Sequence, residues 1–177
     1  MIRPFQGITP TIHESAYIDE SAVVIGDVHI GEQSSVWCNV TIRGDCHYIR
    51  IGNRTNIQDN SCIHVTNGTH ATILEDDVTI GHSVTLHGCY VERGALIGIG
   101  AIVLDGARIG SYSLVAAGSL VTPGIQIPPR SLVMGAPAKV KRQLTDEECA
   151  DLDIFWNNYV LYTEQFKAED WTTTVSS

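Results

Sequence analysis

Residues 91–121 read VERGALIGIGAIVLDGARIGSYSLVAAGSLV, and an aliphatic residue recurs in this stretch at every sixth position. These positions are Val91, Ile97, Val103, Ile109, Val115 and Val121. The positions four further on hold small residues: Ala95, Ala101, Ala107, Ser113 and Ser119. A period of six matches neither an amphipathic helix, with its period of 3.6, nor a half-buried strand, with its period of 2. It predicts short strands joined by tight corners, with the aliphatic residue inside and the small residue at the corner.

The same repeat extends towards the N-terminus. It runs from Ile12 to Ile42, resumes after a shift from Ile51 to Ile63, and returns at Ile80. Three such hexapeptides form one triangular coil, and successive coils stack at the sheet spacing of ~4.8 Å. Each coil buries its apolar side chains only against its neighbours, as in any solenoid. We therefore predict an all-β solenoid, a parallel β-helix with roughly six coils between Ile12 and Val121.

The repeat also sets the expected domain organisation. We expect a hexapeptide-repeat domain over residues 1–124, an extended linker rich in Pro and Gly over 125–144, a helix over 145–168 and a tail over 169–177. Thr145 and Glu148 form a capping box, which marks the start of a helix. Apolar residues then follow at helical spacing and are expected to pack on a flat face of the solenoid: Leu152, Trp156, Tyr159 and Phe166.

Composition excludes several classes of function. The formal net charge is −9 and the pI about 5.1, with no basic stripe, so we expect no nucleic-acid partner. The sequence holds no apolar run long enough for a membrane span and no apolar signal segment at its start. Its five cysteines contain no CxxC pair. These features together predict a cytoplasmic protein with no membrane contact.

Histidines cluster where the repeat is interrupted. The phase breaks after Ile42, at residues 44–50, and again after Ile63, at residues 66–72. Three histidines in or beside these coils are predicted to point outward: His64, His82 and His87. Because His64 and His82 are 18 residues apart, or one coil, we expect both near the same edge. Three imidazoles with an open fourth position are typical of catalytic zinc, although cobalt and ferrous iron also suit such ligands.

The sequence resembles a known family at this point. Four motifs carry the resemblance: IRGDCHYIRIGNRTNIQDN at residues 42–60, CIHV at 62–65, IGHSVTLHGC at 80–89 and MGAPAKVKR at 134–142. Together they look like a gamma-class carbonic anhydrase-like protein, in a shorter branch of that family. The resemblance implies a left-handed parallel β-helix with a C-terminal α-helix alongside. It also implies a homotrimer with zinc sites between subunits.

The resemblance further implies residue roles. It implies that His64 and His87 of one subunit, and His82 of its neighbour, bind the metal. Gln58 matches the glutamine that hydrogen-bonds the metal-bound water or bicarbonate. The other matched residues are expected beside the site: Arg43, Asp45 and Asp59 in an interface network, and Tyr159 from the C-terminal helix. The implied reaction is reversible hydration of CO2 to bicarbonate by metal-bound hydroxide.

The sequence departs from the family pattern in one respect. Residues 66–72, TNGTHAT, stand where other members have an acidic loop, and no carboxylate follows until Glu75. Cys46 replaces a further glutamate. A positioned proton-transfer group contributes ~10²–10⁴-fold to rate, so its absence predicts a slow enzyme. Two alternatives remain: a hexapeptide-repeat acyltransferase or thioesterase acting on CoA thioesters, and a non-catalytic metal-binding trimer.

Overall fold

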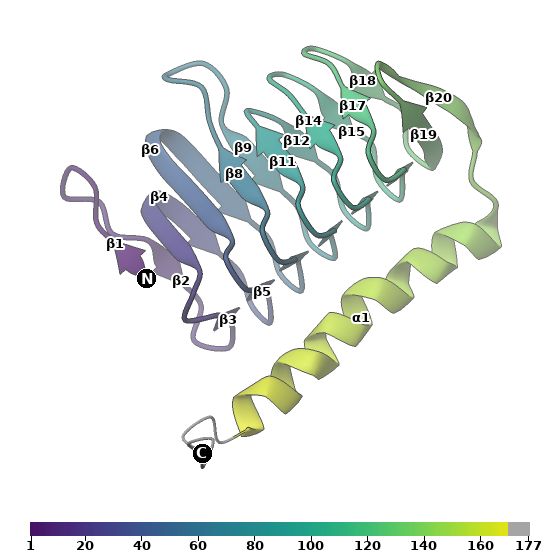
Figure 1. Cartoon of the computed structure of the whole chain (residues 1–177). Helices are drawn as coiled ribbons and strands as arrows, with labels where there is room; N and C mark the ends of the chain where they lie inside the picture. The colour runs from purple at the N-terminus through teal and green to yellow at the C-terminus, as the bar shows by residue number, and fades with distance from the viewer. Residues whose placement is uncertain (170–177) are drawn as a thin grey trace, which may run out of the picture.

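The computed structural model describes residues 1–169 and confirms a parallel β-helix with one C-terminal α-helix (Figure 1). The first coils contain β1 (Ile2–Arg3), β2 (Thr11–Ile12), β3 (Tyr17–Ile18), β4 (Val23–Ile30), β5 (Ser35–Val36), β6 (Thr41–Ile51) and β7 (Asn56–Ile57). The middle coils contain β8 (Cys62–His64), β9 (Thr72–Leu74), β10 (Thr79–Ile80), β11 (Thr85–His87), β12 (Tyr90–Val91), β13 (Leu96–Ile97) and β14 (Ile102–Val103). The last coils contain β15 (Arg108–Ile109), β16 (Leu114–Val115), β17 (Leu120–Val121), β18 (Gln126–Ile127), β19 (Ser131–Gly135) and β20 (Ala138–Gln143).

The strands line the three faces of a prism. One face carries β3, β5, β7, β10, β13, β16 and β19 in hydrogen-bonded order. The second, here called the open face, carries the start of β6 followed by β8, β11, β14 and β17. The third carries the end of β6 followed by β9, β12, β15 and β18. Each coil therefore visits the three faces in turn, and each strand pairs with the strand one coil away.

The aliphatic repeat forms the core. Ile57, Ile80 and Ile97 are paired in register on adjacent coils, and each is 0 % exposed. The small corner residues are buried as well, and Ala95 is 1 % exposed. The solenoid has about seven coils, because residues expected to form an extended linker carry β18 and β19 as a further coil. The following strand, β20, then turns back antiparallel to β19.

Helix α1 (Asp146–Ala168) returns along the first face towards the N-terminal coils (Figure 1). Thr145 and Glu148 form the predicted capping box. The Trp37 ring lies 5.4 Å from the Tyr159 ring and 4.9 Å from the Phe166 ring, between ring centroids, so the predicted apolar stripe faces the solenoid. Within residues 1–169, no helix is apolar enough over a sufficient length to cross a membrane. Apart from Glu169, the tail predicted over 169–177 lies outside the described residues.

Glu148 offers a pH-dependent test of how α1 is anchored. Two hydrogen bonds of 2.7 Å from Arg142, and one of 2.9 Å from the Thr145 amide, lower the pKa of its carboxyl to about 2. Since the folded pKa lies below the ordinary value of 4.5, the carboxylate stabilises the fold above that pH. This stabilisation is lost as the pH falls towards 2. We expect Glu148→Gln to lower the urea midpoint at pH 7.

The difference between this variant and the wild type should shrink as the pH is lowered from about 4.5 towards 2. Glu147→Gln, in the same helical turn, is the matched control. Equal effects of the two substitutions at pH 7, or a difference independent of pH, would contradict this view of the helix start.

Candidate metal centre

The structure brings His64 and His87 together on the open face. They end the neighbouring strands β8 and β11 and are partners in the register of that pair. His64 Nδ1 lies 3.2 Å from His87 Nε2, and the ring centroids are 5.1 Å apart. Two of the three predicted metal ligands therefore face each other, and the space between these two ring nitrogens is here called the gap.

The prediction that His64 and His82 share an edge is wrong. His82 lies in the corner before β11, whereas His87 ends β11, so the two occupy opposite ends of one strand. The loop after β8 is the physical reason. A bridge between Thr66 and His70 closes this loop, and the residues between them lie outside the coil. The coil spacing at this point is consequently 23 residues, as in the pairing of His64 with His87.

The corner that carries His82 holds a second group of predicted site residues. His82 Nδ1 lies 3.0 Å from Asp59 Oδ2. Gln58 precedes Asp59 and is 6 % exposed. Burial, together with the negative charge of Asp59, raises the pKa of Tyr159 to about 12, so that its hydroxyl keeps its proton. The predicted site residues thus form two groups, one at each end of β11.

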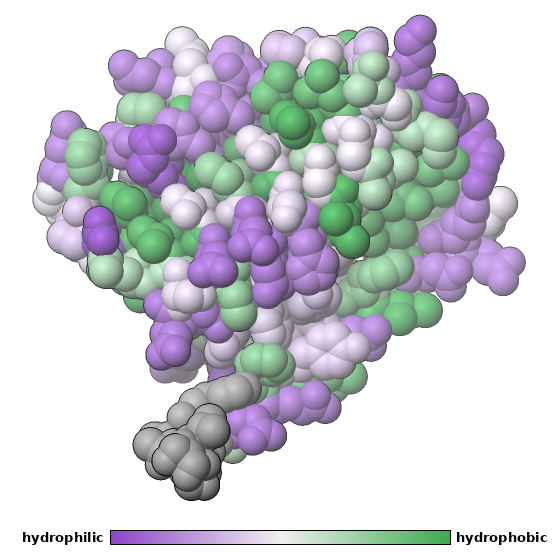
Figure 2. Space-filling view, in the orientation of Figure 1, coloured by the Kyte–Doolittle hydropathy of each residue, from purple (hydrophilic) through white to green (hydrophobic). Residues whose placement is uncertain are grey.

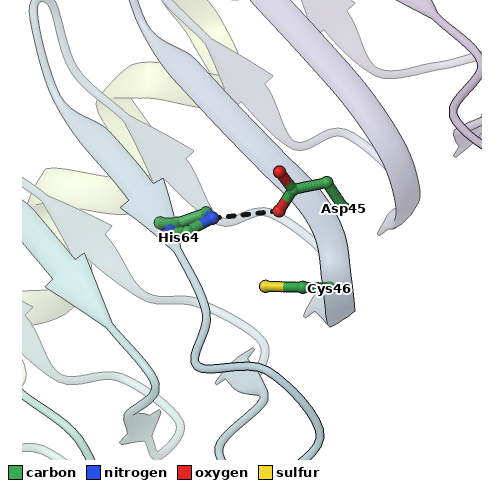
Figure 3. Close-up of side chains that lie close together, drawn as sticks. All are labelled: Asp45, Cys46 and His64. Carbon is green, nitrogen blue, oxygen red and sulfur yellow. Dashed lines mark hydrogen bonds and ion pairs between the residues drawn. The ribbon is translucent and has the colours of Figure 1, made fainter.

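Asp45 completes the first group. Its Oδ1 atom lies 3.0 Å from His64 Nε2 (Figure 3). Its Oδ2 atom pairs with Arg43. Partial burial opposes ionisation, but the hydrogen bonds with His64 and Arg43 outweigh it and lower the pKa of Asp45 to about 2. The carboxylate is therefore ionised at neutral pH and can only accept hydrogen bonds.

Cys46 lies on the same side of the His64 ring as Asp45 (Figure 3). Its sulfur and the donor atoms of Asp45 and His64 lie within 4.8 Å of one another. Burial raises the pKa of the Cys46 thiol. Cys46 also lines an open pocket of about 570 Å³ beside Asp45. Cys46 therefore borders the site as a neutral thiol.

Asp105 and Thr66 are the site residues that the sequence analysis missed. Asp105 Oδ1 lies 2.7 Å from His87 Nδ1, and Thr66 Oγ1 donates to Asp105 Oδ2 at 2.9 Å. Burial opposes ionisation of Asp105, but the hydrogen bonds with His87 and Thr66 hold its pKa below the usual range. The available signal was the 18-residue spacing between His87 and Asp105, which is one coil.

The two carboxylates decide which atoms face the gap between the histidines. An ionised carboxylate accepts, so the ring hydrogen of His64 lies on Nε2 and that of His87 on Nδ1. In neutral imidazoles, the two nitrogens facing each other at 3.2 Å then both carry lone pairs. Such a pair is repulsive unless a cation lies between them. The donor set therefore fits a metal ion.

Gln58 is held by a chain of buried amides, and this gives a test. Gln58 Nε2 donates to Asn56 Oδ1 at 3.1 Å, and Asn56 Nδ2 donates to Thr79 Oγ1 at 2.9 Å. Asn56→Ala should lower the free energy of unfolding by about 1–3 kcal/mol, measured by urea denaturation, because it leaves buried polar groups without partners. Asn67→Ala, at an exposed loop position, should stay within about 0.5 kcal/mol of the wild type. Similar effects of both substitutions would show that Gln58 is not held in this way.

Several known proteins are similar to this chain over most of its length. Residues 9–44 match the family model described as bacterial transferase hexapeptide (six repeats). A carbonic anhydrase of Geobacillus kaustophilus is 49 % identical over 95 % of this chain and 92 % of its own length. Gamma carbonic anhydrase 1 of Arabidopsis thaliana mitochondria is 44 % identical over 91 % of this chain and 60 % of its own length. A Bacillus cereus crystal structure described as an acetyltransferase has a TM-score of 0.92 and 45 % identity, and the match covers 94 % of this chain and 96 % of that one. The chain belongs to the gamma-class carbonic anhydrase-like family of hexapeptide-repeat proteins.

Proposed function

We propose that this protein is a metal-dependent carbonic anhydrase that reversibly hydrates CO2 to bicarbonate, with zinc as the first candidate metal and Fe²⁺ or Co²⁺ as others. The observation that carries the proposal is the gap between His64 Nδ1 and His87 Nε2, flanked by two carboxylates. Zinc–nitrogen bonds of 2.0–2.1 Å in a tetrahedron separate two ligand nitrogens by about 3.4 Å. The separation of 3.2 Å is close to that value.

A carboxylate contacts each of the three histidines. Asp45 contacts His64, Asp59 contacts His82 and Asp105 contacts His87. Histidine ligands in metal sites commonly donate their second ring hydrogen in this way, which fixes the ring and raises its basicity. The arrangement supports all three as ligands of one metal, His82 being supplied by a second copy of the chain.

The open face supports a trimer. Helix α1 leaves this face uncovered, and hydrophobic residues gather there (Figure 2). Ile102 on β14 is 38 % exposed, and Ile99, beside the His82 corner, is 57 % exposed. If three copies turn their open faces to one axis, the His82 end of each meets the His64–His87 end of the next. This is a heterologous contact that closes into a ring, and it makes three equal sites.

The residues around such a site have distinct tasks. When bound, the metal supplies Lewis acidity that lowers the pKa of water to ~7 and so provides a nucleophile for CO2. His64, His87 and the partner subunit's His82 would hold it. Gln58, fixed by Asn56, orients the reacting oxygen through its amide, and the protonated Tyr159 hydroxyl borders the same corner. The Arg43–Asp45 pair keeps the carboxylate beside His64 in place.

Acyl transfer is the second candidate, favoured by the name of the similar Bacillus cereus structure. A hexapeptide-repeat acyltransferase needs one histidine as a base and no metal. Three carboxylate-bound histidines exceed that requirement. A metal-dependent thioesterase stays open, because the same site would serve it.

The direct test is stopped-flow CO2 hydration by protein purified without oxygen, with its metal content quantified. We expect activity that follows zinc or iron occupancy, disappears on chelation and returns when metal is added. His82→Ala should lose both the activity and the metal, because it removes one ligand. His29→Ala, an exposed histidine on β4, should keep both.

Two results would decide against the proposal. A fully metallated trimer that does not hydrate CO2 but cleaves or transfers an acetyl-CoA thioester would favour the second candidate. Full metal content in the His82→Ala variant would remove His82 from the ligand set.

A further inference from the structure

Asp105 lies outside every motif that identifies the family, yet both of its carboxylate oxygens are engaged at the candidate site. It follows β14 by two residues and sits one coil beyond His87. Its Oδ1 atom faces His87 Nδ1 at 2.7 Å, while its Oδ2 atom accepts from Thr66 at 2.9 Å. A carboxylate held from two sides cannot rotate without losing one of these contacts.

The backbone around Asp105 is shaped to admit the carboxylate. Gly88, directly after His87, has φ +57°, and a Cβ atom there would overlap the Asp105 carboxylate. Glycine is the residue that accepts this conformation and leaves the space open. The close approach of Asp105 to His87 is therefore supported by a second, independent feature of the coil.

Thr66 belongs to the short loop that lacks a carboxylate. It follows β8 by two residues, and its amide donates to the His70 carbonyl oxygen where the loop closes. Its hydroxyl reaches across to Asp105, 39 residues further along the chain. In this sequence the loop thus contributes a hydroxyl that holds a carboxylate, in place of a carboxylate of its own.

We propose that Asp105, held by Thr66, is a positioning residue that fixes the ring of His87 with its Nε2 lone pair towards the gap shared with His64, and thereby sets the metal affinity of the site. The inference rests on the proposed function for the identity of the gap as a metal site. It adds that the loop after β8 acts on the metal through Asp105. Asp105 contacts His87 at Nδ1, the nitrogen that does not face His64.

Metal affinity tests the proposal in the intact chain. Zinc dissociation constants would be measured by competition with a chromophoric chelator for the wild type, Asp105→Ala, Asp105→Asn and Thr66→Val. Asp105→Ala should weaken zinc binding about 10–100-fold. Asp105→Asn should weaken it less, because its carbonyl oxygen can still accept from Nδ1 while its amide donates to Thr66. Thr66→Val should weaken zinc binding by less than Asp105→Ala does.

Asp146→Asn is the matched control, since Asp146 is an exposed carboxylate paired with Arg130 at the start of α1. It should bind zinc like the wild type. Thermal unfolding of the metal-free variants separates positioning from stability, because a positioning role predicts reduced affinity in a protein that still folds. Wild-type zinc affinity in Asp105→Ala would overturn the proposal.

The tautomer of His87 gives a readout that does not need metal. Nitrogen-15 NMR of the metal-free protein should show the His87 hydrogen on Nδ1 in the wild type and a shift towards Nε2 in Asp105→Ala. If the wild type binds none of zinc, Fe²⁺ and Co²⁺ but shows this tautomer change, the proposed function fails while the positioning role stands. If the wild-type hydrogen lies on Nε2, the positioning role is wrong whatever the metal affinity.

Discussion

Backbone hydrogen bonds between successive coils fix the register on which the rest of the molecule depends. Because β7, β10 and β13 pair in register, Ile57, Ile80 and Ile97 stack as one column of the core. The same register stacks outward side chains at equal offsets, and a shift of one residue would move each of them to the opposite side of its strand. His64 and His87 meet for this reason alone, as partners on β8 and β11.

The sequence was sufficient for the fold because every coil repeats the same two requirements, an aliphatic residue inside and a small one at the corner. It also located the helix, since the Thr145–Glu148 capping box depends only on local spacing. The site was harder to predict. The bridged loop between Thr66 and His70 adds residues that the repeat does not count, so His64 aligned with His87 and not with His82. For Asp105 the sequence offered one signal, its spacing of one coil from His87, but the contact with Thr66, 39 residues away, depends on how the loop after β8 folds.

The hydrogen bonds of the histidines favour a metal ion shared by two of them, whereas the fold keeps the third histidine away from this pair. Carboxylates at Asp45 and Asp105 draw the ring hydrogens outward and leave two lone pairs facing each other, which calls for a cation. The third carboxylate-bound histidine, His82, stands at the far end of β11. If all three histidines bind the metal, a single chain would supply two ligands at one end of β11 and one at the other. Under the proposed function, assembly of copies through the open face would bring His82 to the other two histidines, and metal binding would be a property of the oligomer.

Complementation between variants tests this division of the site most directly. His64→Ala and His82→Ala chains would each be purified, then unfolded together in equal amounts, refolded and assayed for bound zinc. Each variant alone lacks one ligand in every site. In the mixture, a site is complete when one neighbour supplies an intact His64 and the other an intact His82. The account predicts zinc in about a quarter of the sites after mixing and almost none in either variant alone. Full zinc binding by one variant alone, or no recovery in a mixture that forms trimers, would contradict it.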